Sequence, residues 1–264
     1  MDLQLVGKSA LVTGSTAGIG LAIAQGLARE GARVLINGRT EERVDAAVAA
    51  IKKQFPDGLV EGFAGDLGRA EVADALLKRY PAVEILVNNL SIFEPKEFTE
   101  ITDDDWRRFF EVNILSGVRL SRGYLPRMLK KDWGRIVFIS SESALQIPAE
   151  MIHYGMTKTA QLAIARGLAE LTTGTGVTVN SVLPGPTASE GVTDFVTRLA
   201  KQQNQSVEEF EQQFFEKVRP SSLLKRFAST EEVANLVVYV CSPLASATNG
   251  SALRVDGGVV RAIV

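Results

Sequence analysis

The chain has 264 residues, of which 45% are hydrophobic and 23% charged, with 29 basic against 31 acidic side chains and a formal net charge of −2. This ordinary globular balance argues against a surface built for nucleic acid or an anionic membrane. A single cysteine, Cys241, excludes disulfides within the chain, thiolate zinc sites and Cys-x-x-Cys redox chemistry, and we expect no metal site. No apolar run reaches the roughly 18 residues of a membrane span, and the N-terminus lacks a signal-peptide pattern, so we expect a cytoplasmic protein.

Short apolar runs alternate with helical patterns along the whole chain. Seven of these runs are the predicted strands: Ser9–Thr13, Arg33–Asn37, Leu59–Ala64, Glu84–Asn88, Arg135–Ser140, Thr178–Val182 and Ser251–Val255. Nearly continuous apolar runs are typical of parallel strands that are covered on both faces. The alternation therefore predicts an α/β fold, in which one doubly wound parallel sheet with helices on both faces forms a single domain over residues 1–264.

Capping patterns mark the starts of two predicted helices. Thr102 and Asp105 have the spacing of a capping box, and they open a long helix that runs toward Met128. Ser229 and Glu232 repeat the pattern later in the chain.

The stretch 186–220 carries no strand signal and contains the amphipathic run Val207–Val218. Long excursions of this kind in a compact domain are typically lids or binding loops, so we expect a substrate lid here. The alternative is a solvated helical hairpin.

A glycine-rich turn follows the first predicted strand. The segment LVTGSTAGIG places Gly14, Gly18 and Gly20 between this strand and the first helix. Glycine at these positions permits a tight exit from the strand and lets the backbone approach a pyrophosphate. The N-terminus of the helix then offers free N–H groups to the phosphates. This context predicts a dinucleotide site rather than a glycine-rich loop without a ligand.

With Thr13 the turn is TGSTAGIG, and here the chain resembles the short-chain dehydrogenase/reductase family, from Leu5 to Gly258. The resemblance implies a nicotinamide cofactor and a seven-stranded Rossmann sheet. It is strongest to 3-oxoacyl-carrier-protein reductases and related ketone reductases. It places the cofactor on the turn residues Gly14, Ser15, Thr16, Gly18, Ile19 and Gly20.

The end of the second predicted strand decides which nicotinamide cofactor fits. An acidic residue there would bind a ribose hydroxyl and repel a 2′-phosphate, but the sequence has Arg39. In the family an arginine in this place resembles a 2′-phosphate ligand, helped by hydroxyls such as Ser15 and Thr40, and its planar fork suits phosphate. We therefore favour NADP(H), while the nearby Glu41 and Glu42 leave NAD(H) as the alternative.

Positions after later strands also follow the family pattern. Asp66 and Leu67 match the position that meets the adenine. Asn89 matches a position that faces the ribose, although it could also bond the loop backbone. Leu90 and Ser91 depart from the small residues usual in the family. The nicotinamide carboxamide is expected at Pro184, Gly185, Thr187 and Ser189.

Tyr154 and Lys158 are four residues apart in a helical stretch, which puts both on one face. A free phenol has a pKa near ~10, and a neighbouring ammonium favours the phenolate and lowers that pKa. Tyrosine could then exchange a proton with a carbonyl or alcohol oxygen. Ser141 lies just past the end of a predicted buried strand, at the edge where ligands bind, and can donate a hydrogen bond to that oxygen.

The resemblance assigns these residues together. The family's catalytic pattern is a serine followed by a tyrosine and a lysine at this spacing, which Ser141, Tyr154 and Lys158 match, with Ser140 as the alternative serine. Asn113 fits the fourth catalytic position and would support a water chain from the lysine. By the same analogy, Tyr154 and Lys158 also contact the cofactor, and Lys158 holds the nicotinamide ribose.

The sequence thus predicts an oxidoreductase that transfers a hydride between a nicotinamide cofactor and a ketone or secondary alcohol of 3-oxoacyl or related type. One alternative is a dinucleotide-binding sensor or scaffold without catalysis. Another is a hydrolase built on Ser141 and His153, although no G-x-S-x-G elbow surrounds the serine. His153 is expected to point away from the pocket or to its rim, because adjacent helical residues lie about 100° apart.

The expected partners are a small-molecule substrate and further copies of the chain. By resemblance, the helix that opens at Thr102 and the helix that carries Tyr154 pack against partner subunits, which predicts a homodimer or homotetramer. The substrate is expected to have an apolar part, in a pocket shaped by the stretch 186–220 and by Phe93, Gln146, Ile147 and His153.

Overall fold

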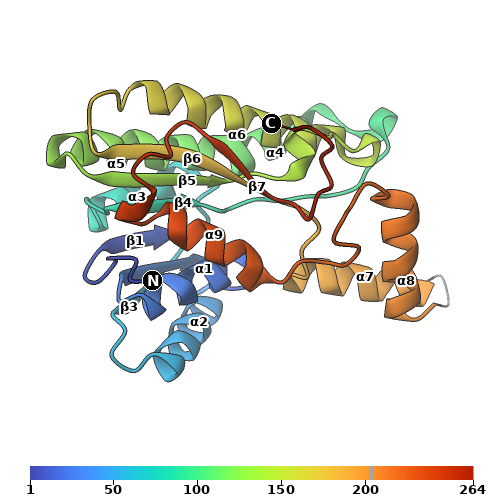
Figure 1. The fold of residues 1–264 in the computed structure, drawn as a ribbon, viewed down its shortest axis with the longest axis horizontal. Coiled ribbons are helices and arrows are strands. Elements are labelled where there is room, and N and C mark those ends of the chain that lie inside the picture. The colour runs from blue at the N-terminus through green and yellow to red at the C-terminus, as the bar shows by residue number, and fades with distance from the viewer. Residues whose placement is uncertain (203–204, 264) are drawn as a thin grey trace.

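The computed structural model describes residues 1–202 and 205–263. Within these residues, seven parallel strands form one sheet in the order β3-β2-β1-β4-β5-β6-β7 (Figure 1). The strands are β1 (Ser9–Val12), β2 (Arg33–Gly38), β3 (Val60–Ala64), β4 (Ile85–Asn88), β5 (Gly134–Ile139), β6 (Val177–Pro184) and β7 (Ala252–Val255). All seven predicted strands are present with small shifts at their ends, so the doubly wound parallel sheet is confirmed.

Helices cover both faces of the sheet (Figure 1). They are α1 (Gly18–Arg29), α2 (Glu41–Gln54), α3 (Ala70–Arg79), α4 (Asp103–Phe110), α5 (Ser116–Lys131), α6 (Ile152–Glu170), α7 (Glu190–Gln202), α8 (Val207–Gln213) and α9 (Thr230–Val240). One apolar core contains Ile23 of α1 and Val237 of α9, and the other contains Leu76 of α3 and Tyr124 of α5. The sheet therefore lies between two separate cores, as the apolar strands require.

The predicted long helix is present but is interrupted near its middle. Thr102 and Asp105 form the expected capping box at the start of α4. Between α4 and α5 lies a π turn, Glu111–Leu115, in which the N–H of Ser116 donates to the carbonyl of the first turn residue. Asn113 lies inside this turn, so a wide helical turn presents the predicted fourth catalytic residue.

The described residues of the stretch 186–220 are largely helical, which is compatible with both a lid and a helical hairpin. The stretch contains α7, α8 and a π turn, Phe214–Val218. Figure 1 shows α7 and α8 projecting from the body of the molecule at one end of the sheet. This position allows the stretch to border a cavity at that end.

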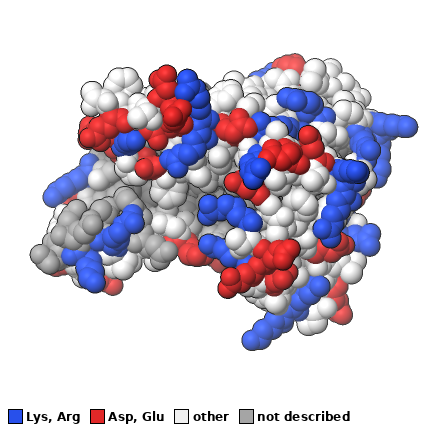
Figure 2. Space-filling view, turned by 180° about the vertical axis from the view of Figure 1, so that it is seen from behind, with Lys and Arg blue, Asp and Glu red and all other residues white. Residues whose placement is uncertain are grey.

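The surface and the core agree with the composition of the chain. Figure 2 shows basic and acidic side chains interspersed over one face of the molecule. No helix in the described residues is long and apolar enough to cross a membrane. Cys241 is fully buried in the core beneath α9, where it packs as a small apolar side chain.

Candidate active site

A cavity of about 990 Å³ lies at the carboxyl ends of the strands. Ile139 of β5 and Pro184 of β6 contribute to its wall, and the side chains of Ser141, Tyr154 and Lys158 line it. Three of the four predicted catalytic residues therefore meet in one cavity. Its position is the edge at which open α/β sheets bind their ligands.

The glycine-rich turn borders the same cavity through Gly18, Ile19 and Gly20. Gly14 and Gly18 have φ angles of +59° and +57°, which favour glycine. A Cβ on Gly20 would lie 2.4 Å from the Gly14 carbonyl oxygen, so only glycine fits there. No side chain caps the N-terminus of α1, and its first N–H groups face the turn without a side-chain acceptor. This arrangement fits a pyrophosphate group.

Asn89 connects the end of β4 to the glycine-rich turn by hydrogen bonds. Its Nδ2 donates to the carbonyl oxygens of Thr13 at 2.9 Å and Gly14 at 3.0 Å, and the residue also lines the cavity. Both interpretations of Asn89 are therefore compatible with its position. The N–H of Leu90 donates to Thr13 Oγ1, and the Leu90 Cα lies 3.3 Å from the point where a Cβ of Gly14 would stand. The backbone of residue 90 thus packs directly on Gly14.

The segment after β6 forms the opposite wall. A Cβ on Gly185 would lie 2.5 Å from the carbonyl oxygen of Asp256, so the backbone of this segment packs directly on the chain after β7. Thr187 Oγ1 donates to the Gly185 carbonyl oxygen at 2.9 Å. The four predicted carboxamide positions all line the cavity: Pro184, Gly185, Thr187 and Ser189.

Several predicted site residues do not line this cavity. They are Gly14, Ser15, Thr16, Arg39, Thr40, Asp66, Leu67 and Asn113. Ser15 is fully buried, donates to the Val12 carbonyl oxygen and accepts from the N–H of Asn37, so its hydroxyl serves the fold. This placement does not support a phosphate contact through Ser15.

Four more residues of this group lie around the ends of β2 and β3. Arg39 is exposed after β2, and Thr40 caps α2 by accepting from the N–H of Arg43. Asp66 accepts from the N–H of Gly68, while Leu67 is buried. The cavity reaches the first turn of α2 through the Arg43 side chain, which sequence reasoning did not single out.

Tyr154 and Lys158 project from one face of α6, as their spacing predicts. The Lys158 Nζ lies 5.4 Å from the centre of the Tyr154 ring. It donates to the Ile139 carbonyl oxygen at 3.0 Å and to Gln161 Oε1 at 3.4 Å. The ammonium is thereby fixed between the end of β5 and the next turn of α6.

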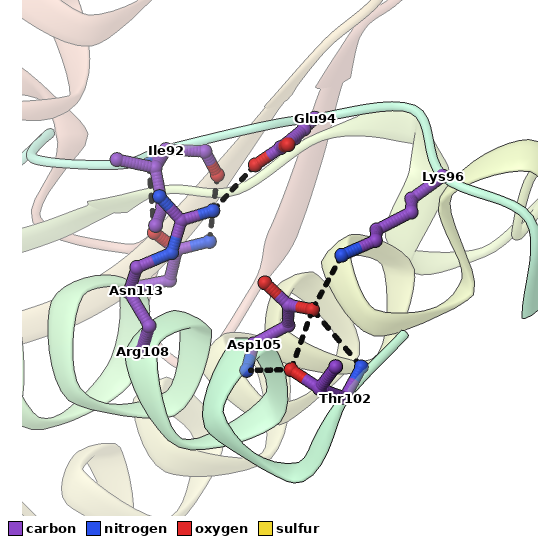
Figure 3. Close-up of polar contacts among 7 residues, drawn as sticks. All are labelled: Ile92, Glu94, Lys96, Thr102, Asp105, Arg108 and Asn113. Atoms are coloured by element: carbon purple, nitrogen blue, oxygen red, sulfur yellow. Dashed lines mark hydrogen bonds and ion pairs between the residues drawn. The ribbon is translucent and has the colours of Figure 1, made fainter. Parts of the chain in front are cut away.

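Asn113 is linked to Lys158 indirectly, through Gln161. Its backbone carbonyl oxygen accepts from Gln161 Nε2 at 2.7 Å, so Gln161 bridges Asn113 and Lys158. The Asn113 side chain accepts from the N–H of Ile92 and donates to its carbonyl oxygen (Figure 3). It also donates to Thr157 Oγ1 at 3.0 Å. Asn113 therefore ties the π turn to the loop after β4 and to α6.

Two ion pairs hold the same loop against α4. Figure 3 shows Arg108 reaching Glu94, and Lys96 reaching Asp105 of the capping box. The Lys96–Asp105 distance is 2.7 Å. This anchoring places Phe93 in the cavity wall, where its ring meets the Tyr154 ring edge to face with centres 6.4 Å apart.

The pKa values of the pair differ from the sequence expectation. Burial raises the pKa of Tyr154, the Glu142 carboxylate raises it further, and a hydrogen bond from Ser141 acts in the opposite direction. Burial lowers the pKa of Lys158 to about 7, against the effect of Glu142. Contrary to the expectation of a lowered phenol pKa, burial of Tyr154 and the Glu142 carboxylate outweigh the effect that lowers it.

Three other expectations about the cavity need comment. His153 is fully buried, does not line the cavity, and packs on Phe109 with ring centres 4.0 Å apart. Neither ring nitrogen has a hydrogen-bond partner among the described residues, so the geometry gives no Ser141–His153 pair. Gln146 and Ile147 are exposed and do not line the cavity, whereas Phe93 does.

Sequence reasoning missed three residues that act on the site: Gln161, Glu142 and Arg219. Gln161 lies three residues after Lys158, on the same helix face, which is a signal that the spacing offered. Glu142 directly follows Ser141, but its partner Arg219 is 77 residues away in sequence. Only the folded chain brings that pair together.

Comparison with known proteins identifies the family. A sequence profile described as short chain dehydrogenase matches residues 8–200. The chain belongs to this family. It is therefore an NAD(P)-dependent oxidoreductase that acts on CH–OH or C=O groups.

Individual members of the short-chain dehydrogenase family match the chain over its full length. "Uncharacterized oxidoreductase YvaG" of Bacillus subtilis is 53% identical, with 100% of both chains covered. The 3-oxoacyl-[acyl-carrier-protein] reductase FabG of Aquifex aeolicus is 33% identical, over 98% of this chain and 100% of FabG. The crystal structure of L-sorbose reductase from Gluconobacter frateurii, complexed with NADPH and L-sorbose, has a TM-score of 0.93 and 32% identity, covering 100% of both chains.

Proposed function

We propose that the protein transfers a hydride between NADP(H) and a ketone or secondary alcohol of 3-oxoacyl or related type. One observation carries the proposal: Ser141, Tyr154 and Lys158 line the same cavity as the glycine-rich turn. The turn fits a pyrophosphate, and the three side chains lie beside the position expected for a substrate carbonyl next to the cofactor.

In this proposal NADP(H), when bound, supplies or accepts the hydride. Tyr154 gives a proton to the carbonyl oxygen, or takes one from the alcohol. The raised pKa keeps its phenol protonated at neutral pH, which suits the donor role in reduction. Lys158 holds the ribose hydroxyls, and Ser141 positions the substrate oxygen. Asn113 and Gln161 hold Lys158 in place.

We propose NADP(H) over NAD(H) on the basis of two arginines, Arg39 directly after β2 and Arg43 in the first turn of α2. Arg39 is exposed beside the N-terminus of α2, and Arg43 reaches the cavity wall. Arg43 also pairs with Glu190 of α7 at 3.3 Å, and both side chains line the cavity. Two cations near this position would favour a 2′-phosphate. The L-sorbose reductase structure with NADPH supports the same choice.

A ketose is a second candidate substrate, because the fold matches that L-sorbose reductase with a TM-score of 0.93.

The stretch 186–220 is proposed as the substrate lid, since Val192, Phe210 and Phe214 of its helices line the cavity. We also propose a homodimer or homotetramer; a mass near 28.5 kDa by light scattering would contradict it.

The test measures NADPH and NADH oxidation with 3-oxoacyl thioesters, ketoses and simple ketones. Tyr154→Phe should lower kcat by about 10²–10⁴-fold, because it removes the proton donor, while NADPH binding stays intact. Tyr239→Phe is the matched control, because Tyr239 lies partly exposed on α9 and outside the cavity lining. Full activity in Tyr154→Phe, or tighter use of NADH, would overturn the corresponding part of the proposal. NADPH binding without turnover of any carbonyl would favour a sensor.

A further inference from the structure

Arg219 is a buried arginine in the wall of the active-site cavity, and the proposed function gives it no role. It directly follows the π turn Phe214–Val218 in the proposed lid stretch, and its side chain is 11% exposed. A guanidinium keeps its charge and carries N–H donors on Nε, Nη1 and Nη2. Removing it from water is costly unless acceptors compensate these donors. Its partners therefore indicate what it can still bind.

The protein occupies two of the three guanidinium nitrogens. Nε donates to Glu142 Oε1 at 3.3 Å. Nη1 donates to the carbonyl oxygen of Val218 at 3.0 Å and lies 3.5 Å from Glu150 Oε1. Nη2 has no acceptor among the residues that the structure describes, and it is not one of their fully buried polar atoms without a partner. Since the side chain lines the cavity, the N–H groups of Nη2 are the donors that Arg219 can offer to a ligand.

The direction of these donors is fixed by the rest of the side chain. The guanidinium is planar, so the bonds of Nε and Nη1 also set the direction of Nη2. The Phe214 ring lies beside the group, with its centre 5.8 Å from the guanidinium carbon. A donor held in this way loses little conformational freedom when a ligand binds, which favours binding.

The charge of Arg219 is already balanced by the protein. Glu142 and Glu150, which both line the cavity, share this one guanidinium. A ligand carboxylate at Nη2 would place a third negative charge beside them, whereas an uncharged oxygen accepts the hydrogen bond without that repulsion. Lys217 also lines the cavity, but it is exposed and its Nζ donates to Gln213 Oε1 at 3.5 Å, so water screens its charge.

The surroundings of the guanidinium favour an apolar substrate body. The Phe214 ring stacks on the Phe227 ring with centres 5.3 Å apart, so the lid stretch presents an aromatic surface next to Arg219. Burial of apolar surface against such a wall stabilises a ligand, and one donor then fixes its orientation. The apolar side chains that line the cavity here are Met151, Val192, Val196, Phe210, Phe214 and Phe227.

We propose that Arg219 is a specificity-determining residue of the substrate site: its Nη2 donates a hydrogen bond to an uncharged oxygen that the substrate carries on an apolar body, in addition to the oxygen of its reacting carbonyl. The substrate class is then a ketone with a second, uncharged acceptor oxygen. An oxo acid with a free carboxylate and a simple ketone both lack this group. The inference rests on the proposed function, because it places a carbonyl compound in the cavity.

The first test measures binding without turnover. The probes are methyl 3-oxobutanoate, the 3-oxobutanoate anion and 2-heptanone, in which the second oxygen is uncharged, charged and absent. Ligand-observed NMR gives their Kd values for the protein saturated with NADP⁺, which cannot reduce a ketone. The ester should bind about tenfold more tightly than the anion or 2-heptanone, because a hydrogen bond from a charged donor is among the stronger ones.

Two variants separate the hydrogen bond from the charge. Arg219→Lys keeps a cation for Glu142 and Glu150 but loses the planar fork, so the ratio of ester to 2-heptanone affinity should fall about tenfold. Glu150→Gln removes one of the two carboxylates, so binding of the anion should improve relative to the ester. Arg226→Lys is the matched control, because Arg226 pairs with Glu232 outside the cavity lining and should keep the wild-type ratios.

The inference is overturned if the ester has no advantage in the wild type, if Arg219→Lys leaves the ratio unchanged, or if no probe binds. Should Arg219→Lys fail to fold, the order of the wild-type affinities and the effect of Glu150→Gln still decide it.

The second test repeats the comparison with NADPH and measures kcat/KM. The ester should be the best substrate of the three, and Arg219→Lys should lower the ratio of ester to 2-heptanone kcat/KM about tenfold. If the ester binds as expected but no probe is reduced, the proposed function fails and the binding role of Arg219 stands. If the probes are reduced with no dependence of the ratio on Arg219, the proposed function stands and this inference fails.

Discussion

The glycine-rich turn makes a sharp prediction about Gly20. In Gly20→Ala the new methyl group would lie 2.4 Å from the Gly14 carbonyl oxygen and 2.5 Å from Asn89 Nδ2. One of these atoms is backbone, and the other belongs to the amide that bonds Thr13 and Gly14. The turn must therefore open, or the amide must give up its hydrogen bonds.

The size of the effect follows from these contacts. Overpacking a tight site costs typically ~1–3 kcal/mol. Loss of the two Asn89 hydrogen bonds adds ~0.5–1.5 kcal/mol each, and the better helix propensity of alanine offsets ~1 kcal/mol. The net loss of stability is roughly 2–4 kcal/mol, which lowers Tm by roughly 5–15 °C for a domain of this size.

Gly167→Ala is the matched control. Gly167 lies exposed on α6, with no atom within 4 Å of an added Cβ, so the same methyl group should leave Tm unchanged or raise it slightly. Thermal unfolding followed by circular dichroism measures both variants, and NADPH fluorescence measures binding, which Gly20→Ala should weaken. Equal Tm values for the two variants, with equal NADPH affinity, would refute the packing argument.

Two further predictions follow from buried titratable groups. Burial lowers the pKa of Lys158 from 10.5 to about 7, so the unfolded chain binds more protons than the folded chain between these values, and stability rises with pH in that window. Lys158→Met lacks this pH dependence. We therefore expect its Tm to exceed that of the wild type at about pH 7, and the difference to shrink toward about pH 9.5. A difference that stays constant would speak against a buried neutral lysine. Burial raises the pKa of the Cys241 thiol to about 12, so a thiol reagent should label it only in denaturant, and rapid labelling of the folded chain would contradict this.

Much of the fold could be predicted because its signals are local. Most of the parallel strands are nearly continuous apolar runs, so they stand out in the sequence. The capping boxes at Thr102 and Ser229 are short patterns, and both are present in the structure. The approach of Ser141 to Tyr154 and Lys158 follows from one rule, that parallel strands present their carboxyl ends at one edge of the sheet.

The rest could not be predicted, because it depends on burial and on distant contacts. The direction of the Tyr154 pKa depends on how much water the folded cavity excludes, which spacing in the sequence does not report. Ser15 was expected at a phosphate, but its hydroxyl bonds Val12 and Asn37, because β2 passes directly beside the turn. Ile147 was expected in the pocket, yet it is 50% exposed outside the cavity lining.

The π turn at Glu111–Leu115 has a consequence for the evolution of the chain. A wide turn holds one residue more than a regular α-helical path between the same two ends. Deleting one residue there would make the helix continuous between the same two ends, so α5 would keep its position. Leu120, Tyr124 and Met128 would then stay buried against the sheet, but Asn113 would lose the wide turn that aims its side chain at Ile92 and Thr157. The extra residue of this segment is thus constrained by the contacts of Asn113 rather than by the packing of α5.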